Sequence, residues 1–201
     1  PDHLGEIFRI QGVVVSPNFQ GSNVEYVVQD MSGGIVLFQF GSFSSVSLTY
    51  GDSIEVIGEL DQFNGKTEII PLEEQYVTVL ANDATLPEPE VITLGELGEM
   101  YENMVLKFEN LTMVSDPSEW PGDGSSANLE VTDGVDTLTM RIDGDTEAED
   151  ATPPTGLFNL TGVGGQYSSS GEGGYQVLPR FPSDFEYLQS NVALTDAYAA
   201  S

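Results

Sequence analysis

Acidic side chains dominate the residues of this chain that could do chemistry. The stretch 143–150 reads DGDTEAED and places five carboxylates within eight residues. Carboxylate oxygens are hard ligands that suit calcium, so Asp143, Asp145, Glu147 and Asp150 are candidate ligands of a weak Ca²⁺ site. The stretch lacks the D-x-D-x-D-G start and the twelfth-position Glu of an EF-hand. A solvated acidic loop is the favoured alternative, because runs of charge are usually solvated.

The other residue types offer no catalytic constellation. The chain has no cysteine, and its single histidine is His3, next to the start of the sequence. A Ser or Thr nucleophile needs a neighbouring base. Nothing singles out one pair for acid–base work among the 33 acidic residues. We therefore expect a protein that is not an enzyme and that requires no cofactor.

The charge balance is strongly acidic, with 5 Lys and Arg against 33 Asp and Glu and a formal net charge of −28. Nucleic-acid affinity comes largely from cations that neutralise phosphates, so this balance disfavours nucleic acid as a partner. It suits divalent cations, high salt or solubility outside the cell. The few cations are scattered along the chain: Arg9, Lys66, Lys107, Arg141 and Arg180.

No apolar run reaches the roughly 20 residues of a membrane span, so we expect no membrane insertion. No signal peptide is visible, and the sequence starts at Pro1 rather than Met. We expect a processed protein that works outside the cell or on its surface.

Two hairpins organise the elements that must position these residues. In the first, over 26–38, apolar runs flank a turn with Asp30, Ser32 and two glycines, and these turn residues bond their own backbone or supply positive φ. The second, over 129–140, alternates more cleanly around an Asp-Gly turn. Each follows a long predicted strand, with Gly12 as a predicted bulge in the first.

The chain contains two copies of one β unit. The stretch 58–63 aligns with 162–167, sharing Gly, then Gln four residues on, then an aromatic residue. Asn64-Gly65 predicts a further two-residue hairpin in the first copy. A proline ends the next strand in each copy. Thr93 and Glu96 form a capping box that predicts a short helix over 94–101.

Several of these residues resemble a known pattern. YVVQD at 26–30 with GGI at 33–35, then YGDSIEVIG at 50–58, resembles OB-like domains of secreted bacterial proteins, which often sit beside extracellular endonuclease modules. GYQVLPR at 174–180, followed by Ser183-Asp184, resembles the ending of the same accessory regions. The resemblance covers residues 6–188 and implies a secreted tandem OB module without the catalytic domain.

We therefore predict an all-β fold of two tandem OB-fold-like five-stranded barrels, with a short helix after the linker. The first barrel takes residues 1–80 and the second takes residues 93–188. A Pro-rich linker covers 81–92, and a C-terminal tail covers 189–201. Two sequons, at Asn110 and Asn159, permit N-glycosylation, although both fall in predicted strands.

The tail carries small and apolar residues suited to pairing with an exposed sheet edge. If it is extended, Val192, Leu194 and Tyr198 would fill pockets on a neighbouring copy, and such a head-to-tail contact propagates into a fibre. The sequence thus favours an extracellular structural protein that binds other copies of itself, such as a subunit of a surface filament. The alternative is an accessory, substrate- or nucleic-acid-binding module of a secreted nuclease or other hydrolase.

Overall fold

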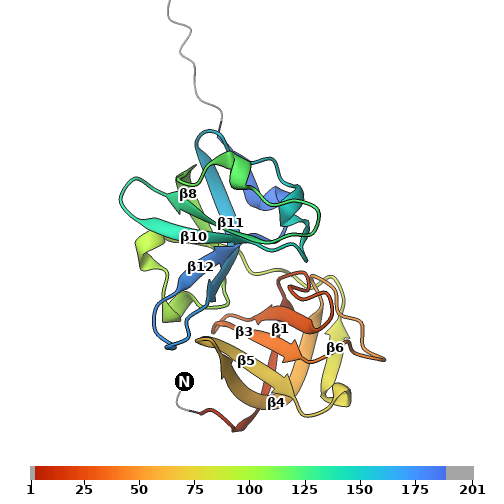
Figure 1. Ribbon diagram of the computed structural model, residues 1–201. Coiled ribbons are helices and arrows are strands. Elements are labelled where there is room, and N and C mark those ends of the chain that lie inside the picture. The colour runs from red at the N-terminus through yellow and green to blue at the C-terminus, as the bar shows by residue number, and fades with distance from the viewer. Residues whose placement is uncertain (1–2, 189–201) are drawn as a thin grey trace, which may run out of the picture.

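The computed structural model describes residues 3–188, which form two β-barrels in tandem (Figure 1). The first barrel comprises β1 (Ile7–Val14), β2 (Val24–Gln29), β3 (Gly34–Gln39), β4 (Ser53–Phe63) and β5 (Lys66–Pro71). The order β1-β2-β3-β5-β4 closes through a pairing of β4 with β1, and β3 runs parallel to β5. Strand alternation in β4 turns Ile54 and Val56 into the core, where both are fully buried.

The second barrel repeats the first. It comprises β8 (Val105–Met113), β9 (Ala127–Thr132), β10 (Thr137–Ile142), β11 (Phe158–Gln166) and β12 (Tyr175–Leu178). The order β8-β9-β10-β12-β11 closes through β11 and β8, and β10 runs parallel to β12. The predicted all-β fold of two OB-type five-stranded barrels is confirmed.

A sixth strand follows each barrel after a single 3₁₀ turn. In the first copy η1 (Glu74–Tyr76) leads into β6 (Val77–Ala81), which pairs with β4; in the second η6 (Pro182–Asp184) leads into β13 (Phe185–Tyr187), which pairs with β11. Two further 3₁₀ turns lie in the second copy, η4 (Pro117–Glu119) and η5 (Glu147–Asp150).

The repeated glycines have the same packing role in both barrels. A Cβ on Gly58 would lie 2.4 Å from the carbonyl oxygen of Ile70, and one on Gly162 would lie 2.9 Å from that of Leu178. Both contacts are with the next strand of the same barrel, so only glycine lets the two strands approach. The repeat read from the sequence therefore has a structural cause.

The bulge predicted at Gly12 is wrong. The pairing of β1 with β4 runs unbroken from Ile7 to Val13, and Gly12 instead allows close approach, because a Cβ there would lie 2.9 Å from the carbonyl oxygen of Gln29. An irregularity does occur in the second copy, where the register shifts between Phe158 and Leu160 opposite β8. Asn110, in β8, has a positive φ of 58°.

The helix predicted over 94–101 is also wrong, although its capping box forms. Two 3₁₀ turns, η2 (Leu94–Glu96) and η3 (Glu99–Tyr101), replace it. The carboxylate of Glu96 accepts hydrogen bonds from N and Oγ1 of Thr93, both at 2.8 Å. Gly98, between the two turns, is extended at φ −167°. A continuous helix is disfavoured there because glycine loses more entropy in a helix than other residues do.

The linker ends in a short strand, β7 (Glu90–Val91), which pairs in parallel with β8 and so belongs to the second sheet. None of the helical segments in residues 3–188 is long and apolar enough to cross a membrane.

Candidate binding site between the barrels

The two barrels are joined by an apolar contact and by buried hydrogen bonds. Val15, Val27 and Val36 of the first barrel pack in one cluster with Val105 and Val163 of the second. Two buried hydrogen bonds tie this contact. Oε1 of Gln29 accepts from the backbone N of Val105 at 2.9 Å, and Nη1 of Arg180 donates to the carbonyl oxygen of Val15 at 2.9 Å.

A second set of contacts lies at the turn before β8. The carboxylate of Glu102 accepts from the backbone N of Thr67 at 2.8 Å, and Nδ2 of Asn103 donates to the carbonyl oxygen of Thr67 at 3.2 Å. Burial raises the pKa of Glu102, against the lowering effect of the hydrogen bond from Thr67. A Cβ on Gly34 would lie 1.7 Å from the carbonyl oxygen of Asn103. The barrels therefore meet too closely at this point for any residue but glycine.

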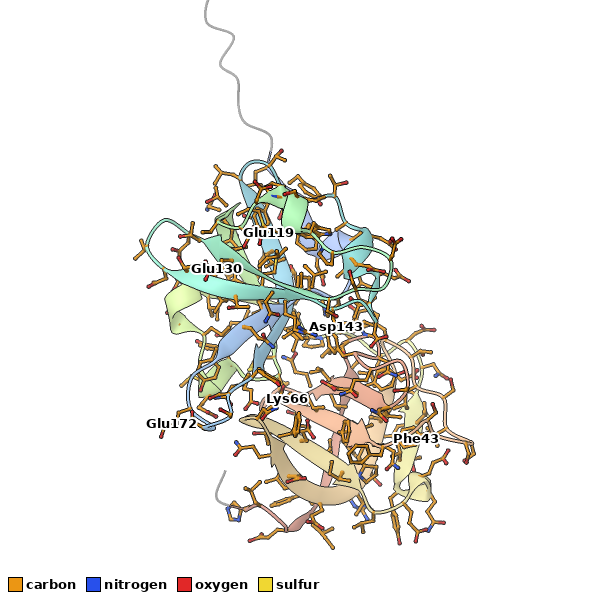
Figure 2. All side chains as sticks on the ribbon, in the orientation of Figure 1. Phe43, Lys66, Glu119, Glu130, Asp143 and Glu172 are labelled. Atoms are coloured by element: carbon orange, nitrogen blue, oxygen red, sulfur yellow. The ribbon has the colours of Figure 1, made fainter. Side chains whose placement is uncertain are left out.

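A pocket of about 470 Å³ opens between the barrels beside these contacts. The first barrel contributes Phe19, Gln20, Glu25, Phe63 and Lys66, and the second contributes Ser126, Asn128, Arg141, Asp143, Asp145, Gly165, Gln166, Tyr167, Gln176 and Leu178. Figure 2 places Lys66 and Asp143 near the boundary, on the first and second barrel respectively.

The lining comes from equivalent parts of the two barrels. In the first, it includes the β1–β2 loop and the residues that flank the β4–β5 turn; in the second, it includes the end of the β8–β9 loop and the residues that flank the β11–β12 loop. In OB folds the face of the second and third strands, with the loops 1–2 and 4–5, is the usual binding surface. Parts of both such surfaces therefore line one pocket.

Both cations of the pocket are held by carboxylates. Nζ of Lys66 lies 2.5 Å from Oε1 of Glu25 and 3.3 Å from Oε1 of Glu68. Burial raises the pKa of Glu68, and the neighbouring Lys66 acts in the opposite direction. Nε of Arg141 lies 3.3 Å from Oδ2 of Asp143. A carboxylate thus offsets part of the charge of each cation in the pocket.

The other three basic residues also form ion pairs with carboxylates. Arg9 pairs with Glu55 at 3.8 Å, Lys107 with Glu186 at 3.0 Å, and Arg180 with Asp184 at 2.8 Å. Every Lys and Arg of the chain thus lies within reach of a carboxylate, and residues 3–188 present no unpaired basic side chain.

Two exposed aromatic rings line the pocket from matching positions. Phe63 is 59% exposed and Tyr167 is 67% exposed, and they are the aromatic residues that close the repeated Gly-x-x-x-Gln-aromatic motif. In the sequence, this motif served only to align the two copies. The repeated aromatic residue after the glutamine could also have indicated a candidate site, since Phe63 and Tyr167 occupy equivalent positions at the end of a long strand.

The glutamine of the second motif copy is fixed in orientation. Nε2 of Gln166 donates to the carbonyl oxygens of Gly173 at 2.8 Å and Gly171 at 3.4 Å. Its Oε1 therefore points the other way, against the turn at Gly65. Within residues 3–188 this oxygen is a buried acceptor without a donor.

The four acidic residues predicted as calcium ligands do not form a cluster. Within the described residues no group of three or more His, Asp or Glu side chains is placed to hold a metal ion. Asp143 faces Arg141 and accepts from the backbone N of Asp145 at 3.1 Å, while Glu147 and Asp150 lie on η5. Weak calcium binding stays a prediction that a titration must test.

Val192, Leu194 and Tyr198, the residues predicted to contact a neighbouring copy, lie outside the described residues. Asn159 of the second sequon is buried, with Oδ1 accepting from the backbone N of Asn110 at 2.9 Å. A glycan would attach to Nδ2, which donates to Oε2 of Glu186 at 3.0 Å in a residue that is 8% exposed, so the folded protein has no room for a glycan at Asn159.

The fold defines a tandem OB-fold protein, and parts of the two surfaces that correspond to the usual OB binding face meet between the barrels. No family model matches the chain. The chain is distantly related to part of endonuclease YhcR of Bacillus subtilis (strain 168), with 24% identity in an alignment of 197 positions that covers 94% of this chain and 16% of that protein. It thus spans only a small part of the length of that relative.

Two solved structures align with most of the chain at low identity. One is the tetrameric p202 HIN2, with a TM-score of 0.39 and 10% identity over 87% of this chain and 90% of that one. The other is the Ifi202 HINa domain in complex with a 20-base-pair double-stranded DNA, with a TM-score of 0.40 and 13% identity over 92% of this chain and 98% of that one.

Proposed function

We propose that the chain is a non-catalytic accessory module of a larger secreted hydrolase of the endonuclease type, and that it holds part of the substrate between its barrels. The observation that carries the proposal is the alignment of 94% of the chain with part of an endonuclease. The convergence of both OB binding surfaces on one pocket supports it. A filament subunit is less well supported, because that hypothesis depends on the tail, which lies outside the described residues.

The substrate class suggested by the relative is nucleic acid, whereas the charge of −28 argues against contacts to phosphate. The two arguments agree if recognition uses the bases. Single strands bind OB folds partly by stacking on aromatic side chains, and Phe63 and Tyr167 offer such rings in the pocket. Base recognition does not require an unpaired cation.

The first experiment measures binding and cleavage with the same purified chain. A fluorescently labelled single strand of about twelve nucleotides, a length suited to OB folds, is titrated with the protein and followed by anisotropy. We expect saturable binding, and no cleavage with magnesium, calcium or manganese. Absence of binding to every single-stranded DNA and RNA tested would contradict a nucleic-acid-binding module. Cleavage that survives extensive purification would contradict a non-catalytic one.

A further inference from the structure

We propose that the pocket between the barrels takes one nucleoside unit, base and sugar together, and leaves the attached phosphates in solvent. The inference depends on the proposed function for the class of polymer. It adds which part of that polymer is recognised, and it predicts an unusual effect of salt.

The size and the rings of the pocket suit a single unit. Its volume of about 470 Å³ lies in the range of small-molecule sites, about 300–1,000 Å³, and is far too small for a duplex. Phe63 and Tyr167 are exposed and line it from the two barrels. A flat base can stack on such a ring whatever its sequence.

The polar lining calls for a ligand that donates hydrogen bonds. Glu25, Asp143 and Asp145 line the pocket, and an ionised carboxylate can only accept. Exocyclic amino groups of bases and hydroxyl groups of the sugar are donors, whereas a phosphodiester at neutral pH has none. These three carboxylates thus match the nucleoside and not its phosphate.

The cations of the pocket lead to the same conclusion. A phosphate at Lys66 would compete with Glu25 and Glu68 for the ammonium group, and a phosphate at Arg141 would compete with Asp143 for the guanidinium group. The surrounding surface is acidic, with a net charge of −28 for the chain. A phosphate next to the pocket is therefore repelled, and added salt screens that repulsion.

This gives a salt dependence opposite to the usual one. Most nucleic-acid-binding proteins lose affinity as salt rises, because counterion release drives their binding. Here the affinity for an uncharged nucleoside should not change with sodium chloride. A nucleoside 5′-monophosphate should bind several-fold more weakly than the nucleoside at low salt, and should approach it at high salt.

The experiment titrates the chain with cytidine, uridine and cytidine 5′-monophosphate by NMR, at about 20 mM and about 500 mM sodium chloride, which differ widely in screening length. Cytidine should bind more tightly than uridine, because its exocyclic amino group supplies two N–H donors whereas the uracil ring supplies only N3–H. Phe63→Ala and Tyr167→Ala should each weaken cytidine binding by roughly tenfold. Phe40→Ala is the matched control, since Phe40 is 81% exposed and outside the pocket lining.

The outcomes separate this inference from the proposed function. Tighter binding of the monophosphate than of cytidine at low salt would overturn the inference, as would unchanged cytidine binding in both pocket variants. Equal competition by methyl glycosides would assign the pocket to a saccharide instead. If labelled single strands bind but nucleosides do not, the inference fails and the proposed function stands. If neither binds, the proposed function fails as well.

Discussion

Arg180 makes the interaction that most directly tests how the barrels are joined. Its Nη2 and Nε donate to the carboxylate of Asp184 at 2.8 and 3.1 Å, and its Nη1 donates to the carbonyl oxygen of Val15 in the first barrel at 2.9 Å. Both side chains of the ion pair are 6% exposed. The substitution Arg180→Ala leaves a buried carboxylate without its cation and a carbonyl oxygen of the other barrel without its donor.

The magnitude follows from these two losses. Removing one partner of a buried ion pair costs about 3–5 kcal/mol, and an unsatisfied buried acceptor costs about 1–3 kcal/mol. Water that enters to solvate Asp184 also reaches the carbonyl of Val15, so the two costs overlap. We expect the free energy of unfolding to fall by about 4 kcal/mol, out of about 5–15 kcal/mol for a typical domain.

The assay is urea denaturation followed by two probes. The only tryptophan, Trp120, packs on Phe185 with ring centroids 5.4 Å apart, so its fluorescence reports on the second barrel, while circular dichroism reports on both. The wild-type chain should give coincident transitions, because the barrels share buried contacts. Arg180→Ala should lower the midpoint and separate the two transitions.

Two further variants make the result decisive. Arg9→Ala is the control, because Arg9 is 65% exposed and lies 3.8 Å from Glu55; such surface pairs contribute about 0–1 kcal/mol. Arg180→Lys keeps the charge but loses the two-pronged contact with Asp184, and should fall between wild type and Arg180→Ala. A loss below about 1 kcal/mol in Arg180→Ala, no larger than in the control, would refute the view that Arg180 helps to hold the barrels together.

Three other perturbations test the contacts between the barrels, the loops and the charge. Gly34→Ala should lower the melting temperature by several degrees, because its Cβ would meet backbone of the second barrel at 1.7 Å, whereas Gly156→Ala has open space and should not. Hydrogen bonds from the Ser44 hydroxyl and backbone N–H groups lower the pKa of Glu74 from 4.5 to about 2; this stabilisation is present above pH 4.5 and is lost as pH falls towards 2, so Glu74→Gln should flatten the acid side of the stability curve. Calcium should raise the melting temperature more than sodium chloride of equal ionic strength if the loop 143–150 binds it, and equal effects would leave only charge screening.

The parts of the fold that depend on neighbouring residues could be predicted from the sequence. Asn64 and Gly65 have φ of 52° and 91°, the positive values that a two-residue hairpin demands and that these residue types tolerate. The capping box of Thr93 and Glu96 formed for the same local reason. The helix predicted over 94–101 does not form beyond single 3₁₀ turns, because glycines at 95 and 98 make a continuous helix unfavourable.

The pocket could not be predicted, because its contacts join residues far apart in the chain. Lys66 finds Glu25 across 41 residues, and Arg180 finds Val15 across 165. In the sequence the five cations are scattered, and no spacing shows that every one of them meets a carboxylate. The pairs of Lys66 with Glu25 and of Arg180 with Asp184 each lie within one barrel, whereas the hydrogen bond from Arg180 to Val15 joins the two barrels. The close approach of Gly34 to Asn103 is hidden from sequence for the same reason.

The motifs behind the resemblance to endonuclease-associated domains acquire a physical meaning from the contacts between the barrels. Gln29 of the YVVQD stretch accepts from Val105, and Arg180 of the GYQVLPR stretch bonds both Asp184 and the first barrel. These residues serve the pairing of two barrels more than the folding of either one. Each barrel supplies part of the pocket wall, so neither alone could enclose a ligand there. The unit that such motifs specify is therefore the pair of barrels, in which the contacts between the barrels set the width of the pocket.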